Sequence, residues 1–180
     1  MKLQTLINER MTQFGQLYRK AFPLLERKPL WLLKSGMRAG TVDLFTFEED
    51  GFCGLAAVIV GETLAMIDYL AVVEEKRSGG IGSKTLALLK ERYAGKCLML
   101  LVEPPDETAP NAGQRIRRLA FYHKNGFNPT GLRVTEFANA MDVLSDGRSV
   151  DFVEYCALLE RAHGRFWTQI IHPRIRKDFC

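Results

Sequence analysis

The amino-acid sequence predicts an α/β (α+β) fold with a mixed, mostly antiparallel central sheet, and three observations support this prediction. The 180 residues are 47% hydrophobic and 26% charged, which is typical of a single globular domain with a sizeable core. Residues 41–73 consist of β-rich runs separated by tight turns, a pattern that indicates an antiparallel meander. After residue 77, amphipathic segments alternate with apolar runs, which indicates helices that connect further strands.

The N-terminal part of the chain has a helical pattern. Apolar residues recur at helical intervals over residues 3–20, so we expect a helix there. Pro23 and Pro29 interrupt the stretch that follows. Residues 21–35 are therefore predicted to form a loop that leads into a short helix.

The meander is predicted to contain three strands. Residues 42–47 and 52–60 are β-rich, and an acidic turn that contains Asp-Gly joins them, as is typical of a hairpin. A second short turn leads to a third strand at residues 63–73.

The second half of the chain predicts a crossover and several shorter elements. Residues 81–94 are amphipathic and end at Gly95, whereas residues 96–103 are almost wholly apolar, as in a strand covered on both faces. A crossover through this helix makes strands 63–73 and 96–103 parallel neighbours. The remaining pattern predicts a helix at 114–124, strands near 127–134 and 136–144, and a helix at 149–162. Residues 163–180 form a basic tail without a clear period, to which we assign no role.

Composition and charge exclude several classes of protein. The net charge of +4 is too small to indicate a nucleic-acid-binding protein, but it agrees with a site for phosphates or acidic groups. The longest apolar stretch, residues 53–60, is far shorter than the ~20 residues of a membrane-spanning helix. The first residues lack the apolar segment of a signal peptide. We therefore expect a cytoplasmic protein with no membrane partner.

The four cysteines do not indicate a metal site. None stands in a C-x-x-C pair, and none has a histidine at ligand spacing. Cys53 and Cys97 lie in apolar runs and are predicted to be buried. Free thiols without an export signal agree with a reducing compartment.

The segment between strand 63–73 and the following helix is the most informative part of the sequence. Three of its residues are glycines, which allow the backbone to approach a ligand closely. The helix begins within the segment, so its free N–H groups and dipole favour a bound anion. A glycine-rich turn without a ligand is the alternative. The candidate phosphate cradle consists of Arg77, Ser78, Gly79, Gly80, Ile81, Gly82 and Ser83.

Two other phosphate-binding motifs fit this segment less well. The G-x-x-x-x-G-K-[ST] motif of nucleoside-triphosphate hydrolases is absent. A dinucleotide fingerprint needs a third glycine where Thr85 stands, although Glu103 follows the next strand at about the distance of a ribose-binding carboxylate. The antiparallel meander upstream also conflicts with the parallel sheet of dinucleotide-binding domains.

Two motifs resemble those of a known family. Leu70-Ala71-Val72, followed after four residues by Arg77-x-x-Gly80-x-Gly82, resembles the acetyl-CoA signature of the GNAT superfamily of N-acetyltransferases. The run AFYHKNGF at residues 120–127 is similar to the segment of that family that ends in Tyr-x-x-x-Gly-Phe. The motifs stand in the family's order, and the predicted elements agree with the family from residue 3 to about 144.

The resemblance implies a fold and a cosubstrate. It implies a GNAT-like sheet with helices on both faces, in which the parallel strands 63–73 and 96–103 splay apart and admit the pantetheine arm of acetyl-CoA. The backbone of Leu70, Ala71 and Val72 would pair with that arm, and the Val72 N–H would stabilise the oxyanion. The amides of residues 78–83 would hold the pyrophosphate. The whole chain, residues 1–180, would then be one N-acetyltransferase domain.

The resemblance also implies catalytic roles. Tyr122 matches the tyrosine that protonates the departing CoA thiolate, with a core side chain as the alternative. Asp68 or Glu103 could take the proton of the amine or bind the substrate. Asp68 lies two residues before Leu70 and is therefore expected on the same face of the strand, with a buried acid satisfied by backbone N–H groups as the alternative.

Further residues are candidates for binding. Many family members carry a CoA-binding asparagine where Arg115 stands, so Asn111 is expected to replace it. Arg118 and its neighbouring arginines either reach the CoA phosphates or form a solvated helix face. Phe22 and Trp31 lie in the segment that shapes the acceptor pocket of the family, and they bind the acceptor or pack in the core.

We therefore expect an N-acetyltransferase that moves acetyl from acetyl-CoA to a primary amine of a small molecule or a peptide, by direct attack and without a metal. A non-catalytic acyl-CoA-binding regulatory module of the same fold is the alternative. Nucleic-acid binding through the arginines and the basic residues 172–177 is the weakest hypothesis. The sequence leaves a homodimer through the C-terminal strands open.

Overall fold

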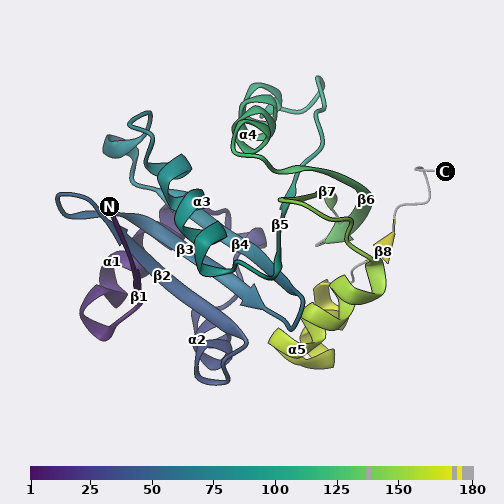
Figure 1. The fold of residues 1–180 in the computed structure, drawn as a ribbon, viewed down its shortest axis with the longest axis horizontal. Coiled ribbons are helices and arrows are strands. Elements are labelled where there is room, and N and C mark those ends of the chain that lie inside the picture. Colours follow the sequence, from purple (N-terminus) through teal and green to yellow (C-terminus); the bar gives the residue numbers. More distant parts are fainter. Residues whose placement is uncertain (137–138, 172–173, 176–180) are drawn as a thin grey trace.

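The computed structural model describes residues 1–136, 139–171 and 174–175 and contains one sheet in the order β1-β2-β3-β4-β5-β7-β6-β8 (Figure 1). The strands are β1 (Lys2–Thr5), β2 (Val42–Glu48), β3 (Phe52–Val60), β4 (Leu64–Val72), β5 (Cys97–Val102), β6 (Asn128–Glu136), β7 (Asn139–Ser145) and β8 (Arg174–Ile175). The helices are α1 (Met11–Ala21), α2 (Leu30–Arg38), α3 (Ile81–Arg92), α4 (Ala112–Lys124) and α5 (Phe152–Ile171), and short 3-10 turns are η1 (Asn8–Arg10), η2 (Leu24–Glu26) and η3 (Glu74–Lys76).

The sheet is mostly antiparallel with one parallel pair, as predicted. β4 pairs with β5 in parallel, but only over four residues of each strand, Leu64–Ile67 and Cys97–Leu100. Both strands continue beyond this region, and Figure 1 shows the β5–β7–β6 part of the sheet running in a different direction from β1–β4. The parallel pair therefore splays apart at the carboxyl ends of its strands, as the resemblance implied.

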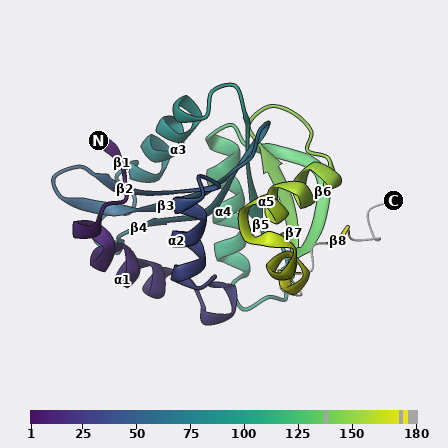
Figure 2. The same cartoon turned by 90° about the horizontal axis from the view of Figure 1, so that it is seen from below.

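Helices cover both faces of the sheet (Figure 2). α1, α2 and α5 pack on one face, where Phe14, Leu33 and Tyr155 are fully buried. α3 and α4 pack on the other face, where Leu86 and Leu89 are buried. This double cover explains why seven consecutive residues of β3 are buried instead of alternating with exposed ones.

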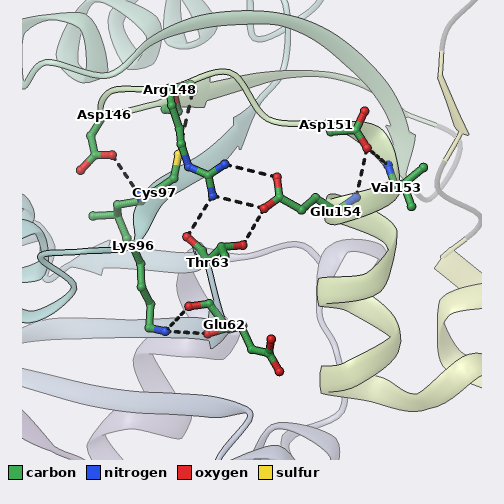
Figure 3. Close-up of polar contacts among 12 residues, drawn as sticks. Glu62, Thr63, Lys96, Cys97, Asp146, Arg148, Asp151, Val153 and Glu154 are labelled. Carbon is green, nitrogen blue, oxygen red and sulfur yellow. Dashed lines mark hydrogen bonds and ion pairs between the residues drawn. The ribbon is translucent and has the colours of Figure 1, made fainter.

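Polar contacts hold the other ends of the parallel pair together (Figure 3). Lys96 Nζ, just before β5, donates to two carbonyl oxygens of the β3–β4 turn at 2.8 and 2.7 Å. Arg148 donates to the Thr63 carbonyl at 3.2 Å and forms an ion pair with Glu154 at 3.2 Å. The strands are thus fastened at their amino ends and open at their carboxyl ends.

A β-bulge in β4 changes which side chains share a face. Ala57 pairs with Tyr69 whereas Val58 pairs with Ile67, so Asp68 is an extra residue on β4. Asp68 contacts the loop after α1, whereas Leu70 packs toward α3 on the opposite face. The expectation that Asp68 and Leu70 share a face is therefore wrong, because the bulge interrupts the alternation of the strand.

The two ends of the chain also differ from the sequence prediction. Residues 3–20 are not one helix: Lys2–Thr5 forms β1 at the edge of β2, and α1 begins only at Met11. Residues 163–171 are not an aperiodic tail, because they continue α5 beyond a kink at Gly164 (φ 75°, ψ 159°). Arg174–Ile175 pairs with β6, and the other tail residues (172–173 and 176–180), including most of the basic stretch, lie outside the described residues.

The cysteine prediction is confirmed for two residues. Cys53 and Cys97 are buried and free, and Cys156 on α5 is free and half-buried. In the parts of the chain that the structure describes, no helix has the length and apolar character needed to cross a membrane.

Gly54 provides a test of how closely β2, β3 and β4 pack. A Cβ atom at this position would lie 2.2 Å from the Ala71 carbonyl oxygen and 2.3 Å from the Phe47 ring. We expect Gly54→Ala to lower the free energy of unfolding, measured by urea denaturation, by about 3 kcal/mol. Gly147→Ala is the control, because a Cβ there meets no atom within 4 Å, and it should change stability by less than about 0.5 kcal/mol. Equal stability of the two variants would contradict this description of the packing.

Candidate active site

A cavity of about 630 Å³ lies where β4 and β5 part. Its walls come from the open ends of both strands, from α4, from the segment after α1, and from the adjoining ends of β6 and β7. It brings together seven of the predicted site residues: Phe22, Asp68, Leu70, Glu103, Asn111, Arg118 and Tyr122. Trp31, expected to bind the acceptor or to pack in the core, is 60% exposed on α2 and does not line the cavity.

The free edge of β4 faces the opening between the strands. Val73 N donates to the Cys53 carbonyl at 2.8 Å, which fixes which residues of β4 bond to β3. Because these residues alternate in an antiparallel pair, Ala71 also bonds toward β3. Leu70 and Val72 then direct their N–H and C=O groups toward the side from which β5 has departed. Backbone groups are thus available at Leu70 and Val72, two of the three residues that the resemblance implied for a cofactor arm, whereas the backbone of Ala71 is used by β3.

The predicted phosphate cradle has the backbone of an anion site. Ser78 (φ 66°) and Gly80 (φ 77°) are left-handed, and α3 begins directly after them without a side-chain cap. The first bond of the helix runs from Lys84 N to the Gly80 carbonyl, so the preceding N–H groups lack partners within the helix. Arg77 lies beside this turn, where its Nε donates to the Val72 carbonyl at 3.2 Å. This geometry favours a bound anion.

Two cradle residues also have packing roles. A Cβ atom on Gly82 would lie 3.0 Å from the Phe121 ring, so this glycine lets α3 approach α4 closely. The Ile81 side chain is buried in a small cluster with Phe47 and Cys53. Ile81 therefore contributes only its backbone to the cradle.

Tyr122 presents a hydroxyl group in the cavity. Its ring is half-buried on α4 and lies edge-on to Phe121 and Phe127, with centroids 5.2 and 6.1 Å away. Burial raises the pKa of Tyr122, and the positive charge of Arg118 partly opposes this. The phenol is therefore protonated at neutral pH. No residue in the described ranges hydrogen-bonds to this hydroxyl, so its proton is available for donation.

Glu103 is bound by residues of α4. Its Oε1 forms an ion pair with Arg115 at 2.7 Å, and its Oε2 accepts from Asn111 Nδ2 at 3.2 Å and lies 3.7 Å from Arg118. Asn111 Oδ1 in turn accepts from Arg115 Nε at 2.8 Å. These contacts tie the end of β5 to α4. Asn111 and Glu103 were both predicted to contact a ligand, but in the structure their side chains hydrogen-bond to each other.

Asp68 is paired with a lysine that the sequence analysis did not single out. Lys28 Nζ lies 2.6 Å from Asp68 Oδ1, and the two side chains are only 3% and 9% exposed. The Tyr69 hydroxyl accepts from Lys28 N at 3.0 Å, and the Tyr18 hydroxyl donates to the Lys28 carbonyl at 3.0 Å. Asp68 is thus a buried acid satisfied by an ammonium rather than by backbone N–H groups. Its Oδ2 is buried and has no hydrogen-bond partner among the described residues.

The sequence analysis also missed Glu136 at the end of β6. Its side chain lines the cavity, is 8% exposed and accepts a hydrogen bond from the Tyr155 hydroxyl. Burial raises the pKa of Glu136 to about 7; Lys28 acts to lower it and Asp68 to raise it. Its position two residues after the buried Val134 is the sequence signal that would have placed it on the inner face of the strand.

His163 is a second unusual buried group near Lys28 and Asp68. It is 6% exposed on α5, and both ring nitrogens lack hydrogen-bond partners in the described part of the chain. Burial lowers its pKa to about 4, and the positive charge of Lys28 acts in the same direction. The imidazole is therefore neutral at physiological pH.

Comparisons with known proteins agree on the fold. No family model and no curated protein sequence matches the chain. A protein from Bacteroides thetaiotaomicron assigned to the GNAT family of acetyltransferases has a similar structure, with a TM-score of 0.73, 20% identity, and coverage of 91% of this chain and 99% of that one. A spermidine N-acetyltransferase from Vibrio cholerae in complex with CoA and spermine has a TM-score of 0.59 and 16% identity, with 80% and 92% covered. An aminoglycoside 6'-N-acetyltransferase complexed with coenzyme A has a TM-score of 0.59 and 15% identity, with 84% and 100% covered.

These likenesses establish that the chain has the fold of the GNAT acetyltransferases, as the two motifs indicated. Within the described residues, no group of three or more histidine, cysteine or acidic side chains could hold a metal ion.

The burial of Glu136 makes stability depend on pH. The pKa of this carboxyl rises from 4.5 to about 7 on folding, so its protonated form is favoured in the folded state. Its stabilising contribution is complete below pH 4.5 and is lost as the pH rises through 7. We expect the free energy of unfolding of the protein to fall relative to that of Glu136→Gln by about 3 kcal/mol between pH 4 and 8. Denaturant unfolding of both proteins across this range measures the difference, and parallel pH dependences would rule this effect out.

Proposed function

We propose that the protein is an acetyl-CoA-dependent N-acetyltransferase that moves the acetyl group to a primary amine by direct attack. One observation carries this proposal: Leu70, on the free edge of β4, and Tyr122, whose hydroxyl has no hydrogen-bond partner among the described residues, both line the cavity where the parallel pair opens. Structures of the same fold include enzymes described in complex with CoA, one of them with the amine spermine.

Backbone groups of the chain hold the cosubstrate in this proposal. Leu70 bonds to the pantetheine arm through backbone groups that no strand uses. The N–H groups at the start of α3 bind the pyrophosphate, and Arg77 adds charge next to them. The Val72 N–H donates to the carbonyl oxygen of the thioester as negative charge develops there.

Tyr122 completes the transfer as general acid. The amine nitrogen attacks the thioester carbon, the C–N bond forms, and the C–S bond breaks. Tyr122 gives its proton to the departing thiolate. A covalent acyl-enzyme is not needed, and none of the three described cysteines lines the cavity.

The acceptor enters on the side of the segment after α1. Phe22 forms part of that wall and contacts the rings of Tyr18 and Tyr69, with centroids 5.6 and 4.8 Å away. Asp68 also lines the cavity, where it is paired with Lys28. The acceptor is a primary amine of a small molecule or a peptide.

Replacement of Tyr122 tests the acid step. We expect Tyr122→Phe to lower kcat about 100-fold, because the thiolate then leaves without a proton donor, while CoA affinity by calorimetry stays the same. CoA release from acetyl-CoA with a panel of primary amines measures the rate. Tyr93→Phe removes a hydroxyl that bonds to Asp43 outside the cavity and serves as the control. Full activity of Tyr122→Phe would remove its role, and CoA binding without turnover on any amine would indicate a non-catalytic binding module.

A charge at the start of α3 tests the cradle. Ser83 lies in the first turn of α3, where an aspartate stabilises the helix but repels a pyrophosphate. We expect Ser83→Asp to weaken CoA binding about tenfold, since a carboxylate then stands near the phosphates. Ser83→Asn, which has the same shape without the charge, should bind nearly as well as the unmodified protein. If calorimetry gives both variants the same Kd, the pyrophosphate is bound elsewhere.

A further inference from the structure

Four carboxylates line the cavity. Three of them are either paired with a cationic side chain or exposed to solvent. Asp68 is paired with Lys28, and Glu103 is bound by Arg115 and Arg118. Glu26 is exposed to solvent at the rim. Glu136 alone among them is buried without an ion-pair partner in the described ranges.

The described residues around Glu136 hold its carboxyl group in position but do not form an ion pair with it. The Tyr155 hydroxyl on α5 donates a hydrogen bond to Oε1, which fixes the carboxyl group and favours its ionised form. Lys28 and Asp68 act on it with opposite signs from the other wall of the cavity. On α5, the Cys156 thiol also senses the Glu136 charge.

We propose that Glu136 takes the proton from the acceptor's ammonium group, directly or through one water molecule, before the nitrogen attacks the thioester. This inference rests on the proposed acetyltransferase function and assigns a residue to the step that the function leaves open. The ammonium must lose one proton to expose its lone pair, and Glu136 passes that proton to solvent. As the C–S bond breaks, Tyr122 protonates the sulfur, and the second proton of the nitrogen returns to the Tyr122 phenolate through solvent.

The position of Glu136 suits this task. Asp68 also lines the cavity, but Lys28 compensates its charge, so Glu136 is the buried carboxylate that is left to take a proton. The raised pKa of Glu136, about 7, brings the carboxylate closer in basicity to an amine than an exposed glutamate, yet leaves it ionised in half or more of the molecules at neutral pH. A proton acceptor of this kind is most effective near pH 7.

The pH dependence of kcat/KM tests the inference. The probe is the best acceptor in a panel of spermidine, an aminoglycoside and a short peptide with a free amino terminus. We expect the unmodified protein to show an acidic limb with a midpoint near pH 7. Glu136→Gln should lose this limb together with at least 100-fold of kcat/KM, and Glu136→Asp should recover part of both.

Tyr155→Phe distinguishes a catalytic role of Glu136 from a structural one, because only a catalytic role predicts a shift of the acidic limb. This variant keeps the Glu136 carboxylate but removes the hydrogen bond that stabilises its ionised form, so the limb should shift to higher pH. It also keeps the test decisive if Glu136→Gln does not fold. Glu62→Gln, an exposed glutamate outside the cavity, should leave rate and limb unchanged.

The outcomes separate the two proposals. If the unmodified protein acetylates no amine, the proposed function fails, and the inference fails with it. If it acetylates an amine but Glu136→Gln keeps both the rate and the limb, or Tyr155→Phe leaves the limb in place, the inference alone is overturned. In each variant, an unchanged Kd for CoA confirms that the cosubstrate site is intact.

Discussion

The interrupted pairing of β4 and β5 is the constraint on which the rest of the site depends. The strands bond over four residues each, and Lys96 and Arg148 fasten them at the end where they begin. Beyond Ile67 the bulge at Asp68 reorients β4, and its outer edge keeps backbone groups without a strand partner. Unpaired backbone groups are costly when they are removed from water, so this edge requires a polar ligand or solvent. The cavity is a further consequence of the same separation.

The acceptor side of the cavity is held by polar contacts as much as by apolar packing. A buried ammonium or carboxylate without a partner would destabilise the fold by several kcal/mol, so Lys28 and Asp68 depend on each other. The hydroxyls of Tyr18 and Tyr69 fix the backbone at Lys28 and thereby the wall that this segment forms. Burial is the main influence on the charge of Glu136, and Lys28 and Asp68, which lie 40 positions apart in the sequence, act on it with opposite signs.

The features that could be predicted from the sequence are those encoded in short segments. The hairpins, the crossover helix and the glycine-rich cradle depend on residues within a few positions of one another, and all three are present in the structure. β1 was missed because its pairing with β2, forty or more residues away, overrides a helical spacing. The bulge at Asp68 leaves no mark in an apolar strand, and the Lys28–Asp68 and Glu136–Tyr155 contacts join distant segments. The motifs thus predicted the cosubstrate side of the site, whereas the acceptor side depends on tertiary contacts.

The outer strand β1, at one edge of the sheet, is very short. β1 has four residues, and the two described residues of β8 cover β6 after the kink at Gly164 has redirected the chain. A long exposed edge strand offers its backbone to a strand of another molecule and so promotes aggregation, and short edges offer little such template. The four-residue β1 therefore offers little backbone to a strand of another molecule, which favours side-chain packing over strand addition at this edge.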